Sequence, residues 1–135
     1  MTVQLLDPHG MLEQEAYHHV AVARGTTFVT VAGQVGWRAG AQLDPDDLPG
    51  QVGQALRNAA TGLAAAGATY ADVVRLTFYV TRWSTDDLAG FMSGVESVAE
   101  ELAIPAPMPP ASLIGVEALY DPDARVEVEV TAVLA

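Results

Sequence analysis

The sequence predicts an α/β (α+β) protein in which a mixed β-sheet carries two helices on one face. Three observations lead to this prediction. Short segments of alternating apolar residues recur along the chain, and two longer segments repeat apolar residues at spacings of three and four. Their order is strand, strand, helix, strand, helix, strand, strand. The 135 residues, half of them hydrophobic, suit one domain spanning residues 1–135.

The chain before residue 38 is expected to form strands. Residues 20–23 and 28–32 are rich in valine and alanine and flank a short segment centred on Gly25. This spacing favours a hairpin with Gly25 in its turn. A short additional strand is expected near Val3.

The first helix is expected after a loop. Residues 38–51 are rich in glycine, aspartate and proline, which is typical of a loop. Apolar residues then recur on one helical stripe, at Val52, Leu56, Ala59, Leu63 and Ala66. Gly67 is well placed to end this helix.

The second half of the chain alternates between strand and helix patterns. Residues 73–81 form a strand with Arg75, Thr77 and Tyr79 on one face and apolar residues on the other. Ser84 and Asp87 predict the start of a helix, which Pro105 ends. The four prolines within residues 104–110 exclude a helix there. Residues 111–118 and 125–133 are expected to form the last two strands.

Two helices cannot cover both faces of such a sheet. Right-handed connections tend to place both helices on the same face, so the opposite face lacks a covering layer. Self-association into a closed oligomer is the expected solution.

The composition excludes several function classes. The net charge is −11, and the six basic residues are scattered arginines, so we expect no binding to nucleic acid or to an anionic membrane. There is no cysteine, and His18 and His19 are adjacent and would point to opposite faces of a strand. We therefore expect no metal and no cofactor. The N-terminal residues lack the pattern of a targeting segment, which predicts a cytoplasmic protein.

Five segments resemble the reactive intermediate deaminase family, also called Rid or YjgF. In order, they are residues 16–22, 28–36, 55–59 and 73–80, and residues 110–116 taken with 126–129. The resemblance covers nearly the whole chain. It implies a chorismate-mutase-like fold with a six-stranded mixed sheet. It also implies a barrel-like homotrimer with small-molecule clefts between subunits.

The resemblance also implies an activity, namely hydrolysis of reactive enamines and imines to ammonia and a keto acid. Active members carry an arginine directly before a serine, where this chain has Ala111 before Ser112. The usual substrate, a free 2-imino acid, would lose its carboxylate anchor, and a charge-assisted hydrogen bond contributes ~1.5–3 kcal/mol. Arg38 and Arg75 are possible substitutes for the missing arginine.

The resemblance assigns the remaining site residues. Glu127 would be the catalytic residue that positions water, and its alternative is a solvated strand glutamate like Glu129. The substrate-binding residues would be Tyr17, Gly33, Gln34, Trp37, Ala111 and Ser112. Tyr17 and Trp37 could instead be ordinary packing residues, and Gly33 a glycine at a strand end. Ala32 stands at the family's serine position.

Three functions remain open at this point. The first is a hydrolase or deaminase acting on an imine, enamine or related metabolite other than the standard 2-imino acid. The second is a non-catalytic trimer that binds a metabolite or a partner protein. The third is the endoribonuclease activity often attached to this family, against which the negative charge argues.

Overall fold

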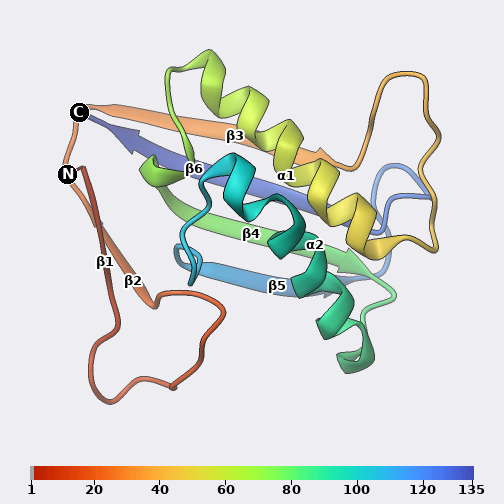
Figure 1. Cartoon of the computed structure of the whole chain (residues 1–135), viewed down its shortest axis with the longest axis horizontal. Coiled ribbons are helices and arrows are strands. Elements are labelled where there is room, and N and C mark those ends of the chain that lie inside the picture. The colour runs from red at the N-terminus through yellow and green to blue at the C-terminus, as the bar shows by residue number, and fades with distance from the viewer. Residues whose placement is uncertain (1) are drawn as a thin grey trace.

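The central element of the fold is a four-stranded mixed sheet with the order β3-β6-β4-β5 (Figure 1). In the computed structural model, which describes residues 2–135, β6 is antiparallel to both of its neighbours and β5 is parallel to β4. The strands are β3 (Thr27–Val35), β4 (Val73–Thr81), β5 (Ala111–Val116) and β6 (Val126–Leu134). The expected mixed sheet and strand order along the chain are confirmed.

The first two strands form a separate two-stranded sheet. β1 (Val3–Leu6) pairs with β2 (Val20–Ala23), so the six expected strands are divided between two sheets. The expected hairpin between β2 and β3 is wrong. The amide of Arg24 bonds the Thr2 carbonyl, whereas the amide of Thr26 bonds the Leu134 carbonyl. The segment around Gly25 therefore passes from one sheet to the other instead of reversing.

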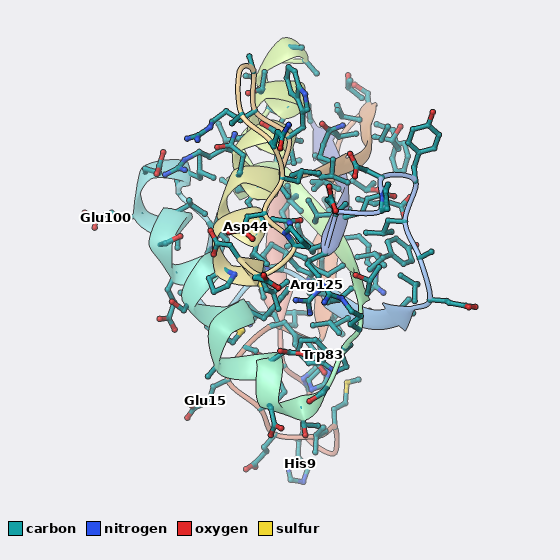
Figure 2. The ribbon with its side chains drawn as sticks, turned by 90° about the vertical axis from the view of Figure 1, so that its right-hand side faces the viewer. His9, Glu15, Asp44, Trp83, Glu100 and Arg125 are labelled. Atoms are coloured by element: carbon teal, nitrogen blue, oxygen red, sulfur yellow. The ribbon has the colours of Figure 1, made fainter. Side chains whose placement is uncertain are left out.

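Two α-helices cover one face of the sheet, α1 (Leu48–Ala65) and α2 (Leu88–Leu102) (Figures 1 and 2). α1 begins inside the segment 38–51 that was expected to be a loop, because the Asp47 side chain accepts the Gly50 amide and caps its first turn. Gly67 follows its end with φ +78°, as expected.

Both of the short 3₁₀ helices that the structure describes begin with a capping box. The short 3₁₀ helix η2 (Thr85–Asp87) leads into α2, and the expected capping box of Ser84 and Asp87 forms at its start. A second 3₁₀ helix, η1 (Tyr70–Asp72), leads into β4.

The core lies between the helices and the sheet. Val52, Leu56, Ala59 and Leu63 of α1 are fully buried, whereas Ala66 is exposed beyond the helix end. The sheet contributes alternate residues of two strands to this core, namely Leu76, Phe78 and Val80 of β4 and Val126, Val128 and Val130 of β6. The side chains at these alternate positions therefore face the helices, and the side chains between them face the opposite side of the sheet.

A buried polar cluster joins the loops at one end of the sheet. The Gln51 amide nitrogen donates to the carbonyls of Asp44 and Asp123, and its oxygen accepts the Arg125 amide. The Arg125 guanidinium donates to the Thr81 carbonyl and lies 3.8 Å from the Asp87 carboxylate, in the interior of the molecule (Figure 2). This cluster holds Arg125 directly before the start of β6, two residues before Glu127.

The helix-free face carries a mixed set of side chains. In register across this face lie Glu127, Glu129 and Thr131 of β6, Arg75, Thr77 and Tyr79 of β4, and Ser112 and Ile114 of β5. Phe28 of β3 is 70% exposed and Ile114 is 45% exposed. No helix within residues 2–135 has the length and apolarity needed to cross a bilayer.

Candidate functional site

Glu127 lies directly over Gly33. A Cβ at position 33 would fall 2.5 Å from Cδ and 2.7 Å from Cγ of Glu127, closer than any real carbon contact. Only a glycine at position 33 leaves room for this carboxylate. The structure thus brings together two residues that the sequence placed in the site, from β6 and from neighbouring β3.

The end of β3 is held in place from α1. The Asn58 amide donates to the carbonyls of Val35 and Trp37, at 2.9 and 2.8 Å. The Gln34 amide donates back to the Ala32 carbonyl, at a point where the pairing of β3 with β6 is irregular. At this irregularity Gly33 lies against the Glu127 side chain, and the side-chain amide of Gln34 is hydrogen-bonded to the backbone.

Ser112 is paired with an arginine from the neighbouring strand. The Arg75 guanidinium donates from Nη2 to the Ser112 hydroxyl oxygen at 2.5 Å. The two residues are 37 positions apart in sequence. The parallel pairing of β4 with β5 brings them together on the helix-free face.

Tyr17 and Ala111 lie together at the free edge of β5. With Ser112 they line an apolar cavity of about 120 Å³, whose other walls are Ala16, Phe78, Leu88, Phe91, Met92, Met108 and Leu113. Backbone bonds between Ala16, His18 and Met108 hold the Tyr17 segment there. Ala111 is half-buried and contributes only a methyl group to this wall.

The predicted site residues therefore form two groups within one chain. The first group is Glu127, Gly33 and Gln34, and the second is Ser112, Ala111 and Tyr17. Ser112 lies in register with Thr77, and Thr77 with Glu129, which is next to Gly33 across the sheet. Neighbouring strands lie about 4.8 Å apart, so Gly33 on β3 is about 14 Å from Ser112 across the sheet, and Glu127 on β6 is about 10 Å from it.

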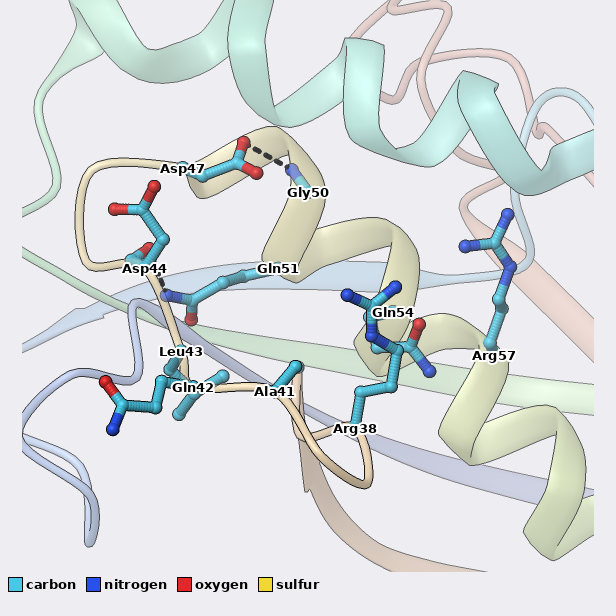
Figure 3. A pocket seen from close by; sticks show the side chains of 11 residues that line it. Arg38, Ala41, Gln42, Leu43, Asp44, Asp47, Gly50, Gln51, Gln54 and Arg57 are labelled. Atoms are coloured by element: carbon cyan, nitrogen blue, oxygen red, sulfur yellow. Dashed lines mark hydrogen bonds between the residues drawn. The ribbon is translucent and has the colours of Figure 1, made fainter.

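Trp37 and Arg38 belong to neither group. Trp37 is 62% exposed in the segment after β3. Arg38 lines a polar, open depression of about 340 Å³ beside Gln54, with Asp44 and Asp47 at its other end (Figure 3). Of the two arginines considered as substitutes, only Arg75 contacts a predicted site residue.

Tyr79 and Glu129 were not among the expected site residues. A hydrogen bond to the Glu129 carboxylate, with smaller contributions from burial and from the charge of Glu127, raises the pKa of the Tyr79 hydroxyl. Glu129 is thereby engaged by a neighbour, while Glu127 lies over Gly33. Sequence alternation placed these residues on strand faces, but it could not show that β4 and β6 are neighbours.

The histidines have local structural roles. The His18 ring lies 2.6 Å from the Asp7 carboxylate, and the His19 ring lies 2.6 Å from the Leu12 carbonyl. Within residues 2–135, no three histidine, aspartate or glutamate side chains gather as a metal site requires.

Comparisons with known proteins agree on one family. The model of the family described as Endoribonuclease L-PSP matches residues 10–134. YyfB from Yersinia pestis, described as a member of the conserved Rid protein family, is 34% identical with a TM-score of 0.86, over 99% of this chain and 100% of that chain.

Two further solved structures are similar along most of their length. Rv2704 from Mycobacterium tuberculosis, a member of the YjgF/YER057c/UK114 family, is 27% identical with a TM-score of 0.62, over 98% of this chain and 99% of that chain. The YjgF gene product of E. coli is 26% identical with a TM-score of 0.67, over 84% and 88%. None of the curated proteins matches the chain. The fold, the family model and the identity to YyfB together show that the chain belongs to the Rid (YjgF) family.

Proposed function

We propose that the protein is a homotrimeric hydrolase of the deaminase type, with clefts for small molecules between its subunits. Its substrate is an imine, enamine or related metabolite other than the standard 2-imino acid. The observation that carries this proposal is the division of the site residues into two groups that lie two to three strand spacings apart on one sheet. A small molecule cannot touch both groups within one chain, but it can where the β3 side of one copy meets the β5 edge of the next.

The helix-free face supports assembly. Phe28 and Ile114 are exposed large apolar side chains on it, and covering them would remove apolar surface from water. A contact between unlike edges is heterologous. Repeated contacts of this kind form a closed ring, such as a trimer, when the rotation between copies allows closure. The resemblance to Rid proteins supplies the number three.

Glu127 supplies the chemistry that imine hydrolysis needs. Its carboxylate accepts a proton from a water molecule as the oxygen attacks the carbon of the C=N bond. The proton is passed to the nitrogen, which gives a carbinolamine. The carboxylate then moves the hydroxyl proton of this intermediate to the nitrogen, so that the C=O bond forms, the C–N bond breaks and ammonia leaves. The packing of this carboxylate over Gly33 limits its positions, which favours this role over that of a freely solvated strand glutamate.

The cavity beside Ala111 supports a substrate with an apolar portion. Its lining includes Tyr17, Phe78 and Met108, and position 111 itself offers no cation. A non-catalytic metabolite-binding or partner-binding trimer is the second candidate, and the methyl groups at Ala32 and Ala111 favour it, because both replace polar groups of the family pattern.

The test is hydrolysis of a panel of neutral imines, followed as ammonia release. Glu127→Gln should reduce turnover at least about a hundredfold. Glu129→Gln, the same change two residues away on the same face, should retain most of it. Turnover that is unaffected by Glu127→Gln would refute the role of Glu127, and an inactive wild-type protein would favour the binding trimer.

Mixed trimers test the division of the site between copies. Glu127→Gln blocks one group and Ser112→Phe blocks the other, so each variant alone should be inactive. Random assembly of equal amounts should recover about a quarter of wild-type turnover, because one cleft in four pairs two intact groups. Mixed trimers without recovery, formed from variants that each fold, would show that both groups act within one chain.

A further inference from the structure

Helix α1 carries three side-chain amides on successive turns, Gln51, Gln54 and Asn58. Residues that are three, four or seven positions apart lie on one side of an α-helix, so these amides follow a single stripe. The stripe runs beside the end of β3 and the start of β6, which are the strands of Gly33 and Glu127. The helix layer thus makes polar contacts with both strands that bear the proposed catalytic group.

Asn58 joins α1 to the end of β3. Both N–H bonds of its amide are used, one on the Val35 carbonyl at 2.9 Å and one on the Trp37 carbonyl at 2.8 Å. Its side-chain oxygen accepts the Gln54 amide at 3.0 Å, which fixes the orientation of the Asn58 amide. Val35 lies directly opposite Glu127 in the pairing of β3 with β6. Asn58 therefore holds the backbone that faces Glu127 across the two strands.

Close packing leaves β3 little room to shift against α1. A Cβ at Gly36 would lie 2.9 Å from the Cα of Gln51, and a Cβ at Gly62 would lie 2.7 Å from Cγ1 of Val31. Strand and helix therefore lie against each other at both of these points. Asn58 lies between them along the helix, where its two bonds set the position of the strand end.

Gln51 joins the same helix to the start of β6. Its side-chain oxygen accepts the Arg125 amide at 2.7 Å, and its nitrogen donates to the Asp123 carbonyl at 2.9 Å. Arg125 is two residues before Glu127. α1 thus holds β3 opposite Glu127 and holds the chain directly before β6. These two attachments together determine how closely the Glu127 carboxylate lies to Gly33.

We propose that Asn58 and Gln51 are positioning residues, which hold the Glu127 carboxylate against Gly33 without touching the substrate. The proposal rests on the proposed function, because it adds the residues that place its catalytic carboxylate. Asn58 is the residue to change, since it is half-buried, whereas a charge introduced at the buried Gln51 would be costly in itself. Asn58→Asp keeps the shape of the side chain but replaces two donors by an oxygen that repels both carbonyls.

The first test measures the contact between Gly33 and Glu127 by NMR, as the nuclear Overhauser effect between the Hα protons of Gly33 and the Hγ protons of Glu127. A Cβ at position 33 would lie 2.7 Å from Cγ of Glu127, so the wild-type protein should give a strong effect. A displacement of about 1 Å in Asn58→Asp should weaken it at least about threefold. Thr61→Val is the matched control on the same helix, because the Thr61 hydroxyl bonds the Arg57 carbonyl inside α1. It should leave the effect unchanged.

The second test measures turnover of the best imine substrate. Asn58→Asp should lower kcat at least about tenfold and leave KM within about twofold, because a misplaced catalytic group affects the chemical step more than binding. In a Glu127→Gln background the same change should alter the remaining rate by less than about twofold, since no carboxylate is left to misplace. A general structural role would lower the rate by the same factor in both backgrounds.

Two results would overturn the assignment, namely an unchanged Overhauser effect in folded Asn58→Asp and an equal loss of kcat in both backgrounds. If Asn58→Asp does not fold, Asn58→Ala removes the same two bonds without adding a charge and is judged by the same measurements. The two proposals can fail separately. An Overhauser effect that depends on Asn58, in a protein that hydrolyses no imine, keeps the positioning role and refutes the hydrolase. Turnover that depends on Glu127 but not on Asn58 does the reverse.

Discussion

Gly33→Ala is the substitution that examines the Glu127 geometry most closely. The new methyl carbon would lie 2.5 Å from Cδ of Glu127, so the carboxylate must move away. Gly33 is not one of the glycines with positive φ, which are Gly10, Gly40 and Gly67. Alanine therefore adds no backbone strain at position 33, and its effect comes from displacing Glu127.

The expected effect is large on turnover and small on stability. Relieving the overlap requires a movement of at least about 1 Å, and a misplacement of that size costs on the order of a hundredfold in rate. Glu127 is half-buried and can rotate toward solvent, so the free energy of unfolding should change by less than about 1 kcal/mol.

The assay is ammonia release from the best imine substrate, alongside thermal unfolding. Gly115→Ala is the matched control, because its methyl carbon would meet Cβ of Trp83 at 3.5 Å, an ordinary contact. If Glu127→Gln abolishes turnover but the Gly33→Ala protein keeps wild-type turnover, the reasoning is refuted. A crystal structure of the variant with the carboxylate unmoved would do the same.

Three further predictions concern the fold and its charge. The buried Tyr70 hydroxyl donates to the Leu56 carbonyl at 2.7 Å, so Tyr70→Phe should lower the free energy of unfolding by about 1 kcal/mol in urea titrations, and an unchanged value would contradict this role. Bonds from the His19 amide and the His18 ring lower the pKa of Asp7, so their stabilisation is present above about pH 4 and is lost as the pH falls further. Hydrogen exchange should show the protection factor of the His19 amide falling between pH 6 and pH 3, and equal protection at both would refute this. The acidic chain should not retain RNA on filters at 0.15 M salt, and tight retention would overturn the charge argument.

Much of the fold was predictable from local sequence patterns. The alternation in residues 73–81 and the helical stripe from Val52 to Leu63 reflect burial on one face, which a single segment reveals by itself. The hairpin around Gly25 was predicted wrongly, because two adjacent strands were assumed to pair with each other. Their true partners, β1 and β6, lie at the two ends of the chain.

The site was predictable only in its parts. The resemblance supplied Glu127, Gly33 and Ser112, but not that Gly33 lies three strand spacings, and Glu127 two, from Ser112. That separation depends on the strand order β3-β6-β4-β5, which no local pattern encodes. The partnership of Arg75 with Ser112 depends on the same order, since it joins residues 37 positions apart.

The most direct test of the account is the mass of the protein in solution. Sedimentation equilibrium at micromolar concentration should give a single species of three chains of 14.1 kDa each. A stable species with the mass of one chain would contradict the account, because Glu127 and Ser112 would then have no second copy to bring them to one substrate.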